Sequence, residues 1–446
     1  MPWTLVTGRL TRVTLKPVPW IAPTASAPVQ STVSLPGSKS MTARALVLAA
    51  ASVGPSTLHA PLRARDTELM AAGLRALGVH VSTMDDKRWE IRPRPLHGPA
   101  HVDVGLSGTV MRFVPPLAAV ANGEVTFDGD PYARKRPMGP IINALRELGA
   151  QIDASPADGL PLAIHGKGSL PGGEVTIDSS ASSQFVSGLL LSGVDYDHGV
   201  TVRHVGPPVP NEPHLRMTVQ MLRAAGAAVD DSVKDVWVVA PGRLTGRAWQ
   251  IEPDLSGAAP FFAAALVTGG RVTLAGWPRT SVQAVGKVRE IFAALGGSVT
   301  LDESGLTVAG TGKIHAVDVS LGDIAELTPV VAALATLADG PSHLYGVGNI
   351  RYHETDRLAA LATELGGLGA SVEEKPDGLL ITPKPLAGTQ FRTYDDHRMA
   401  HAAAVIGLRV PEIHLDDVGC TAKTLPSFPH LWADLVKSGS NNGAEG

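Results

Sequence analysis

The sequence predicts an α/β protein made of repeated units, in which helical crossovers join parallel strands. Two patterns predict this fold class. A helix of small residues followed by a turn and a strand recurs six times, and its strands open at residues 54, 123, 199, 270, 340 and 411. A second helix, which ends in glycine and runs into another strand, alternates with the first pattern. Alanine-rich helices and glycine stops are common, but five nearly even spacings of 69 to 76 residues indicate a true internal repeat.

The first helix of each unit and its strand are expected at 45–60, 117–129, 189–205, 261–276, 331–346 and 402–417. The second helix and its strand are expected at 74–81, 145–152, 222–229, 292–299 and 365–372. Glycine suits the left-handed residue that ends a helix, and the apolar residues after it suit a strand. A helix at Phe428–Val436 would complete the sixth copy. Each unit of about 70 residues therefore reads strand–helix–strand–helix–strand.

Composition narrows the class of protein. The chain has 446 residues, of which 44% are hydrophobic, enough for two or three domains. The net charge of −4, the absence of a basic run and an aromatic content of 4% exclude a nucleic-acid binder. The single cysteine, Cys420, indicates a reducing cytoplasm. Residues 1–20 lack the apolar core of a signal peptide, and no apolar run is long enough to span a membrane.

A short polar segment precedes each small-residue helix. Helix amino termini favour anions, and serine or aspartate there could be simple caps. Capping does not account for lysine and arginine near these starts, because a cation opposes the helix dipole. A shared polyanionic ligand would account for them. The segments are PGSKS (36–40), GLSGT (105–109), SSASSQ (179–184), DLSG (254–257), AELTP (325–329) and YDDHR (394–398), and the cations are Lys39, Arg44, Arg112 and Arg398.

Charged residues also open the second helices. Arg136, Arg357 and Lys423 add to the cations, and Glu326 and Glu354 supply carboxylates. Several cations with one or two carboxylates suit a phosphorylated or carboxylate substrate together with proton transfer. Glu354 and Arg357 would equally fit a surface ion pair between residues three apart on a helix. No HExxH motif occurs and the 15 histidines do not cluster, so no metal is expected.

Taken together, these motifs resemble those of 5-enolpyruvylshikimate-3-phosphate synthases, most closely the actinobacterial ones. The resemblance runs in order from Pro36 to Trp432 and rests on PGSKS with RALVLAA, SGTVMR, the RP of ARKRP, SSQF, HETDRL, DDHRMA and AKTLP. It implies a two-domain fold of six βαβαββ units, three in each domain. Residues 36–253 would form an inserted domain, residues 1–35 and 254–446 a discontinuous one, and the active site would lie in the cleft between them.

The resemblance also implies a reaction. The enolpyruvyl group of phosphoenolpyruvate would pass to the 5-hydroxyl of shikimate 3-phosphate, with release of phosphate, in the shikimate pathway of aromatic amino acid biosynthesis. Such enzymes need no metal or organic cofactor and are targets of glyphosate. We therefore expect a cytoplasmic, monomeric transferase whose partners are these two small molecules, with no nucleic acid and no membrane.

The resemblance assigns roles residue by residue. Glu326 would take the hydroxyl proton, and Glu354 or Lys39 would donate a proton. Phosphoenolpyruvate would be held by Lys39, Gly108, Arg136, Gln184, Arg357, Arg398 and Lys423. Shikimate 3-phosphate would be held by Lys39, Ser40, Arg44, Ser182, Ser183, Gln184, Asn211, Glu326, Asn349 and His353.

Four positions depart from the family pattern. Ala43 and Leu106 stand where asparagine is usual, His353 replaces a common lysine, and Asn211 replaces a serine that binds shikimate 3-phosphate. These departures bear on the affinity for the acceptor. Two other readings of the chain are an enolpyruvyl transferase for another acceptor, such as UDP-N-acetylglucosamine, and a non-catalytic repeat scaffold. The first usually uses a loop cysteine in mid-chain, whereas a scaffold would not need complementary polar sets at its helix starts.

Overall fold

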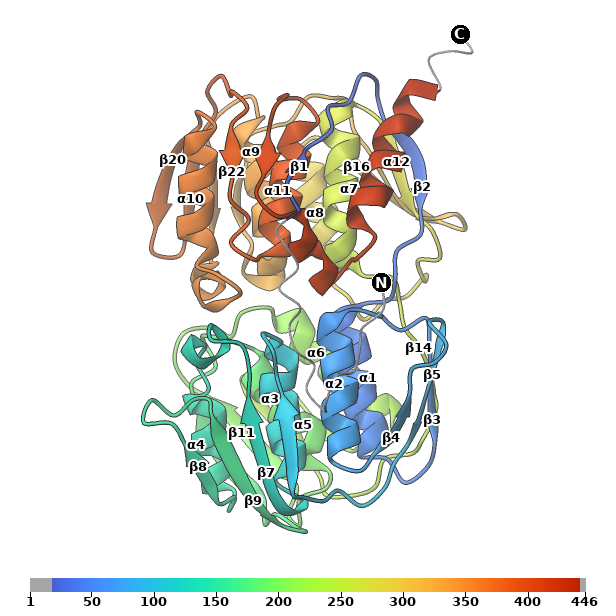
Figure 1. Ribbon diagram of the computed structural model, residues 1–446, viewed down its shortest axis with the longest axis vertical. Coiled ribbons are helices and arrows are strands. Elements are labelled where there is room, and N and C mark those ends of the chain that lie inside the picture. Colours follow the sequence, from blue (N-terminus) through green and yellow to red (C-terminus); the bar gives the residue numbers. More distant parts are fainter. Residues whose placement is uncertain (1–17, 442–446) are drawn as a thin grey trace.

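The computed structural model describes residues 18–441. Its chain forms two halves that meet at one interface (Figure 1). Buried apolar side chains form two separate clusters, one drawn from residues 41–251 and the other from residues 22–33 and 255–435. We refer to residues 39–250 as the first half and to residues 18–33 with 255–441 as the second half.

Three inner helices pack against one another at the centre of each half. They are almost wholly buried, and α3 exposes none of its residues. Small residues allow the helices to approach closely, since a Cβ on Gly188 would lie only 2.1 Å from the carbonyl oxygen of Arg112. The inner helices are α1 (Lys39–Ala50), α3 (Gly108–Ala118) and α5 (Gln184–Gly193) in the first half, and α7 (Leu255–Thr268), α9 (Thr328–Thr336) and α11 (His397–Gly407) in the second.

Six further helices alternate with the inner ones along the chain. The predicted glycine stops are confirmed, because all five lie in the left-handed region, with φ between 95° and 116°. A side chain at these positions would strain the backbone. These helices are α2 (Arg65–Ala76), α4 (Gly139–Glu147), α6 (Glu212–Ala224), α8 (Val285–Ala294), α10 (Arg357–Gly367) and α12 (Phe428–Asn441).

Three sheets are each built from one continuous segment of chain. In each of them the first two strands are parallel and the last two add antiparallel, which gives the βαβαββ unit. In spatial order the strands are β6 (Ala100–Asp103), β7 (Asn122–Asp128), β9 (Leu162–Lys167) and β8 (Ile152–Ala154); β10 (Gly173–Ile177), β11 (Val200–His204), β13 (Val236–Val239) and β12 (Val229–Asp230); and β18 (Asp318–Ser320), β19 (Ser342–Tyr345), β21 (Gly378–Thr382) and β20 (Ser371–Lys375).

The other three sheets take a strand from a distant part of the chain. Strand β14 pairs in parallel with β3, β2 pairs in parallel with β15, and β1 adds antiparallel to β23. The sixth sheet has three strands in the described chain. In spatial order the sheets are β14 (Ala248–Gln250), β3 (Ser56–His59), β5 (Arg88–Arg92) and β4 (His80–Ser82); β16 (Ser298–Asp302), β17 (Gly305–Ala309), β15 (Arg271–Leu274) and β2 (Gln30–Val33); and β1 (Trp20–Ile21), β23 (His414–Leu415) and β22 (Gln390–Phe391).

Within residues 18–441 the chain crosses between the halves twice, after β2 and after β14, and the two crossing segments pair with each other. The backbone N–H of Ser38 donates to Glu252 O at 2.7 Å, and the N–H of Asp254 donates to Pro36 O at 3.1 Å. This pairing sets the amino ends of α1 and α7 side by side at the interface. The first residues of inner helices from both halves therefore come together.

Candidate active site

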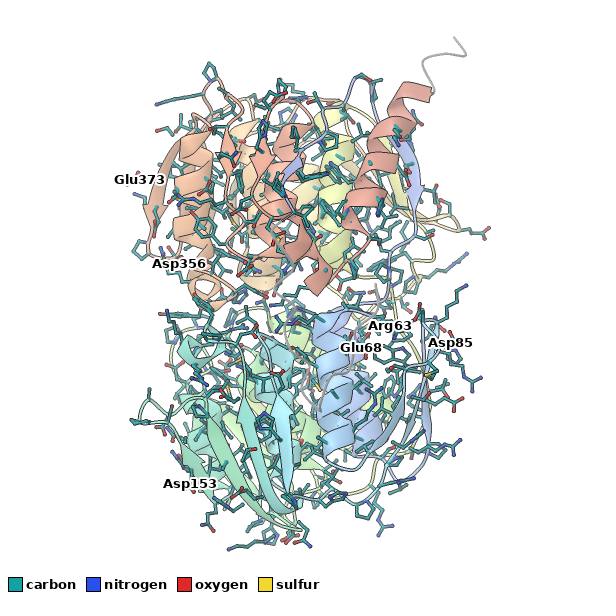
Figure 2. The ribbon with its side chains drawn as sticks, viewed as in Figure 1. Arg63, Glu68, Asp85, Asp153, Asp356 and Glu373 are labelled. Atoms are coloured by element: carbon teal, nitrogen blue, oxygen red, sulfur yellow. The ribbon has the colours of Figure 1, made fainter. Side chains whose placement is uncertain are left out.

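Charged side chains from both halves gather where the inner helices begin. Figure 2 shows the rims of this interface, with Asp356 on the second half and Arg63 and Glu68 on the first. The predicted site residues lie deeper, and most of them are buried. Because amino ends of helices favour anions, the interface suits a negatively charged ligand.

Lys39 opens α1 and is held by two aspartates. Its Nζ lies 3.3 Å from Asp66 Oδ2, and its backbone N–H donates to Asp254 Oδ2 at 3.0 Å. Burial alone would lower the pKa of the Lys39 ammonium, but Asp66 and the two glutamates of the site raise it. Lys39 therefore carries a proton at neutral pH.

Gly108 lies in a cradle of polar side chains at the start of α3. A Cβ on it would lie 2.9 Å from Arg112 Nη1 and 3.0 Å from both Arg136 Nη2 and Gln184 Oε1. Within residues 18–441 neither guanidinium makes an ion pair, and their hydrogen bonds go to the carbonyls of Pro137 and Gly108 and of Leu106. Burial, and then the charge of Arg136, lowers the pKa of Arg112 well below its ordinary value, and the charge of Glu354 offsets part of this effect. Arg136 in turn lowers the pKa of Glu354, so this corner acts on a carboxylate of the second half.

In the second half Arg357 is fully buried and paired on two sides. Its Nε donates to Asp396 Oδ2 at 2.7 Å, and its Nη2 lies 2.8 Å from Glu354 Oε2. The other oxygen of Glu354 binds Lys423 Nζ at 2.6 Å. Burial alone would raise the pKa of the Glu354 carboxyl, but Lys423 and Arg357 hold it well below its usual range. Glu354 is therefore ionised and belongs to a buried ion network.

Glu326 lies on the 3₁₀ helix η2 (Gly322–Leu327), directly before α9. Its Oε2 lies 3.5 Å from Arg398 Nε and 3.6 Å from Arg357 Nη1. Burial alone would raise the pKa of the Glu326 carboxyl, but Arg398 and the neighbouring cations lower it below its usual range. Two hydrogen bonds to Ser256, at the start of α7, fix the guanidinium of Arg398. Glu326 is thus a carboxylate able to accept a proton.

Cations of the two halves meet at one backbone carbonyl. Leu106 O accepts from Arg136 Nη1 of the first half at 3.0 Å and from Lys423 Nζ of the second half at 3.3 Å. The leucine at this position is a departure from the family pattern, but these contacts use only its backbone.

Several buried polar atoms at the interface have no hydrogen-bond partner. Buried polar groups in folded proteins nearly always have one, so a cluster of unsatisfied atoms indicates a site for a polar ligand. The atoms are Nε of Arg112, Arg136 and Arg398, Oε1 of Gln184, and both Oδ1 and Nδ2 of Asn349.

The remaining predicted residues lie in different places. Arg44 is buried within the first half, where its guanidinium binds the side chains of Thr218 and Ser187, and burial lowers its pKa to about 9. Ser40, whose carbonyl accepts from this guanidinium, lines the cavity between the halves. Burial, and then Arg357, lowers the pKa of His353 to about 3, and its Nδ1 lies 2.9 Å from that arginine.

Two predicted serines stand at the start of α5, and Asn211 reaches across the interface. Ser183 is the residue before α5, and Ser182 Oγ accepts from the backbone N–H of Gln184 at 3.2 Å. Asn211 Oδ1 accepts from Ala325 N–H of the second half at 3.1 Å. Ala43, another departure from the family pattern, is buried inside α1.

The structure adds acidic residues that the sequence did not single out. Asp66, Asp254 and Asp396 orient Lys39, Ser256 and Arg357 respectively. Two of them were visible only as helix caps, a role they do fill, because Asp254 accepts from Gly257 N–H and Asp396 from Arg398 N–H. Asp66 follows two arginines in the sequence, and only the fold shows which cation it binds.

The cavity left between the halves is small, about 30 Å³. It is lined by Leu35, Pro36, Lys39, Ser40, His214, Asp254, Ser256, Gly257, Glu326, Arg398, Thr424 and Leu425.

Comparison with known proteins decides the family. A family model described as EPSP synthase (3-phosphoshikimate 1-carboxyvinyltransferase) matches residues 23–432. The chain belongs to this family. A curated 3-phosphoshikimate 1-carboxyvinyltransferase of Mycobacterium ulcerans (strain Agy99) is 51% identical over 431 residues, which cover 95% of this chain and 99% of the relative. The predicted family and enzyme class, a transferase, are confirmed.

Solved structures agree on the fold. EPSP synthase from Acinetobacter baumannii superposes with a TM-score of 0.78 at 25% identity, over 94% of this chain and 98% of that one. The enolpyruvyl transferase NikO from Streptomyces tendae gives a TM-score of 0.75 at 18% identity, with coverages of 94% and 98%, and shares the fold. The predicted fold class is confirmed. Within residues 18–441, no helix is long and apolar enough to cross a membrane.

Proposed function

We propose that the protein transfers the enolpyruvyl group of phosphoenolpyruvate to the 5-hydroxyl of shikimate 3-phosphate. One observation carries the proposal: cations at helix starts of both halves converge on two ionised carboxylates, and several of their buried donors lack a partner. This arrangement suits two polyanionic substrates with a proton acceptor between them. The family of the chain names the same reaction.

Phosphoenolpyruvate has a phosphate and a carboxylate, and the site offers donors for both. In the first half, Arg136 Nη2 faces Gly108 and the Nε of the same guanidinium is unpartnered, while Gln184 Oε1 beside the glycine is an acceptor. In the second half, Arg398 Nε makes no hydrogen bond, although it lies at ion-pair distance, 3.5 Å, from Glu326 Oε2. Since Arg357 and Lys423 are already paired with carboxylates, we propose that they help to position the substrate and balance its charge. Lys39, which lines the cavity with Arg398, would bridge the two substrates.

The proton chemistry divides between two groups. We propose that Glu326 accepts the proton of the 5-hydroxyl as its oxygen adds to C2 of phosphoenolpyruvate, while C3 takes a proton from Lys39. Loss of phosphate and of a proton from C3 then leaves the enol ether. Lys39 suits the donor role better than Glu354, because its pKa is raised whereas that of Glu354 is lowered.

For shikimate 3-phosphate, we propose the serines before α5 as partners of the phosphate. Ser182 and Ser183 lie at a helix amino end, where backbone N–H groups and the dipole favour an anion. Asn349, with both polar atoms unpartnered, would take a ring hydroxyl beside Glu326. Ser40, Arg44, Gln184, Asn211 and His353 complete the proposed set.

We further propose that the two halves are domains, residues 36–253 and residues 1–35 with 254–446, that open and close around the substrates. The separate apolar cores, the two chain crossings and the small cavity support this. We also propose a cytoplasmic monomer, and the single cysteine suits the reducing cytoplasm.

The test is phosphate release from phosphoenolpyruvate with and without shikimate 3-phosphate. We expect release only when both substrates are present, and the organic product should carry the enolpyruvyl group at the 5-oxygen. Release with UDP-N-acetylglucosamine, and none with shikimate 3-phosphate, would instead identify a transferase for another acceptor. The second acceptor is included because NikO, which shares the fold, is described only as an enolpyruvyl transferase.

A further inference from the structure

Asn211 joins the two halves at the segment that carries Glu326. Its backbone N–H donates to Gly322 O at 2.8 Å, and its Oδ1 accepts from Ala325 N–H at 3.1 Å. Asn211 belongs to the first half, whereas both partners lie on η2 of the second half. Asn211 is buried, so these bonds are shielded from water.

The local structure leaves the Asn211 side chain without a partner on its own helix. An asparagine before a helix usually caps it by accepting from the second or third N–H. Here the second residue of α6 is Pro213, which has no N–H, and the N–H of His214 already donates to Asn211 O at 2.9 Å. Asn211 also has φ 54° and ψ 44°, a left-handed conformation that asparagine tolerates better than most residues. The residue type suits a contact across the interface rather than a cap.

The η2 segment, which forms these bonds with Asn211, has an irregular backbone. Ile324, with φ −136° and ψ 40°, interrupts the helical geometry of η2. The N–H of Ala325, the next residue, donates across the interface to Asn211 Oδ1. Glu326 follows at once, so a bond at Ala325 fixes the backbone from which the carboxylate extends.

We infer that Asn211 is a positioning residue, which places the Glu326 carboxylate when the halves come together. The inference rests on the proposed role of Glu326 as proton acceptor. Because its two bonds join different halves, they form only in the closed arrangement, and they link closure to the placement of the base. A serine at this position, as in the family pattern, would have a shorter side chain with which to reach Ala325.

Two substitutions separate positioning from direct contact with a substrate phosphate. Asn211→Gly keeps the left-handed backbone and removes the side-chain oxygen. We expect its kcat to fall about tenfold, the ratio that one such hydrogen bond supplies, with less than a threefold change in the KM for shikimate 3-phosphate. Asn211→Asp keeps the accepting oxygen and should recover most of the lost turnover. If Asn211 instead held the phosphate, the added charge would make Asn211→Asp the worse variant and would raise that KM most.

A measurement on the closed complex, with saturating shikimate 3-phosphate and glyphosate in place of both substrates, provides an independent readout. Hydrogen exchange of the Ala325 amide should accelerate in Asn211→Gly relative to the wild-type protein. Glu212→Ala is the matched control, since this exposed neighbour on α6 pairs only with Arg216 in the described structure. It should change neither the exchange rate of the Ala325 amide nor kcat. Unchanged exchange in Asn211→Gly would overturn the inference, and so would faster exchange with kcat within twofold of wild type. Wild-type turnover tests the reaction itself, so the two failures are distinguishable.

Discussion

The two halves carry their buried cations in opposite ways. In the first half, Arg44 and Arg112 are buried without a carboxylate partner, and burial lowers the pKa of both. In the second half, Arg357 is buried to the same degree but is paired with Asp396 and Glu354, which raise its pKa despite burial. The buried arginines of the first half are therefore bound by neutral groups, whereas Arg357 of the second half is neutralised by carboxylates. The two halves should therefore respond differently when a buried arginine is removed.

The largest effect should follow from changing the base of the second half. Glu326→Gln keeps the size of the side chain and removes its charge. Since general base catalysis typically contributes about 10²–10⁴-fold, we expect kcat to fall by that order. Circular dichroism should show an unchanged fold. A variant with more than half of the wild-type turnover would remove Glu326 from the mechanism.

The stability of matched arginine variants tests the comparison directly. Arg357→Met leaves Asp396 and Glu354 buried with a partner missing, and breaking such a pair costs about 3–5 kcal/mol. Arg112→Met removes a buried charge that makes no ion pair within residues 18–441, and it takes a donor from the carbonyls of Pro137 and Gly108, so we expect a change of less than about 1 kcal/mol or a gain. Chemical denaturation of both variants measures the difference. Equal losses of unfolding free energy in the two variants would show that the buried arginines of the two halves are stabilised to the same extent.

Gly108 tests whether the cradle of the first half holds the ligand. A methyl group there must displace Arg112, Arg136 or Gln184, each about 3.0 Å away. The family resemblance implies that the inhibitor glyphosate, which is longer than phosphoenolpyruvate, would lie against this glycine. Overpacking costs about 1–3 kcal/mol, so Gly108→Ala should weaken glyphosate inhibition about tenfold or more, with a smaller rise in the KM for phosphoenolpyruvate. Equal inhibition constants for the two proteins would place Gly108 outside the inhibitor site.

The sequence was sufficient for the repeat and for the residues at the helix starts. Even spacing located the inner helices, and the glycines located the ends of the second helices, because both depend on local pattern. It could not show that β14 and β2 complete sheets far from them in sequence, since pairing between distant strands leaves no local signal. It also could not separate Arg44, whose guanidinium binds groups within the first half, from Arg136, because both are cations near helix starts.

The same limit applies to the carboxylates and to Asn211. Asp396 read as a helix cap and also proved to be the partner of Arg357, because one carboxylate can accept from both a backbone N–H and a guanidinium. Asn211 was expected to face the acceptor, and its roles there and at the interface are separated by the variants above. Local sequence predicts which residues stand at a helix end, but their partners depend on how the halves meet.

Buried histidines should make the second half the more acid-sensitive of the two. His401 packs on Phe428, and both of its ring nitrogens lack a partner, whereas buried His204 of the first half binds Ser179 N–H and lies 2.7 Å from Pro207 O. Burial, and then Arg398, lowers the pKa of His401 well below 6.5. Because the folded-state pKa lies below the unfolded one, the stabilisation is complete above about pH 6.5 and is lost as the pH falls toward the folded-state pKa.

At about 1.4 kcal/mol per pH unit, this one group should cost the folded protein up to about 2 kcal/mol between pH 6.5 and pH 5. His401→Leu removes the titrating group and keeps an apolar side chain against Phe428, so its unfolding free energy should depend less on pH over that range. Denaturation of both proteins at pH 7.5 and pH 5 measures the difference, and hydrogen exchange at pH 5 locates it, with faster exchange expected in α11 and α12. Parallel pH profiles of the variant and the wild-type protein would mean that His401 gains no charge before unfolding, and a first loss of protection in α1, α3 and α5 would reverse the assignment of the weaker half.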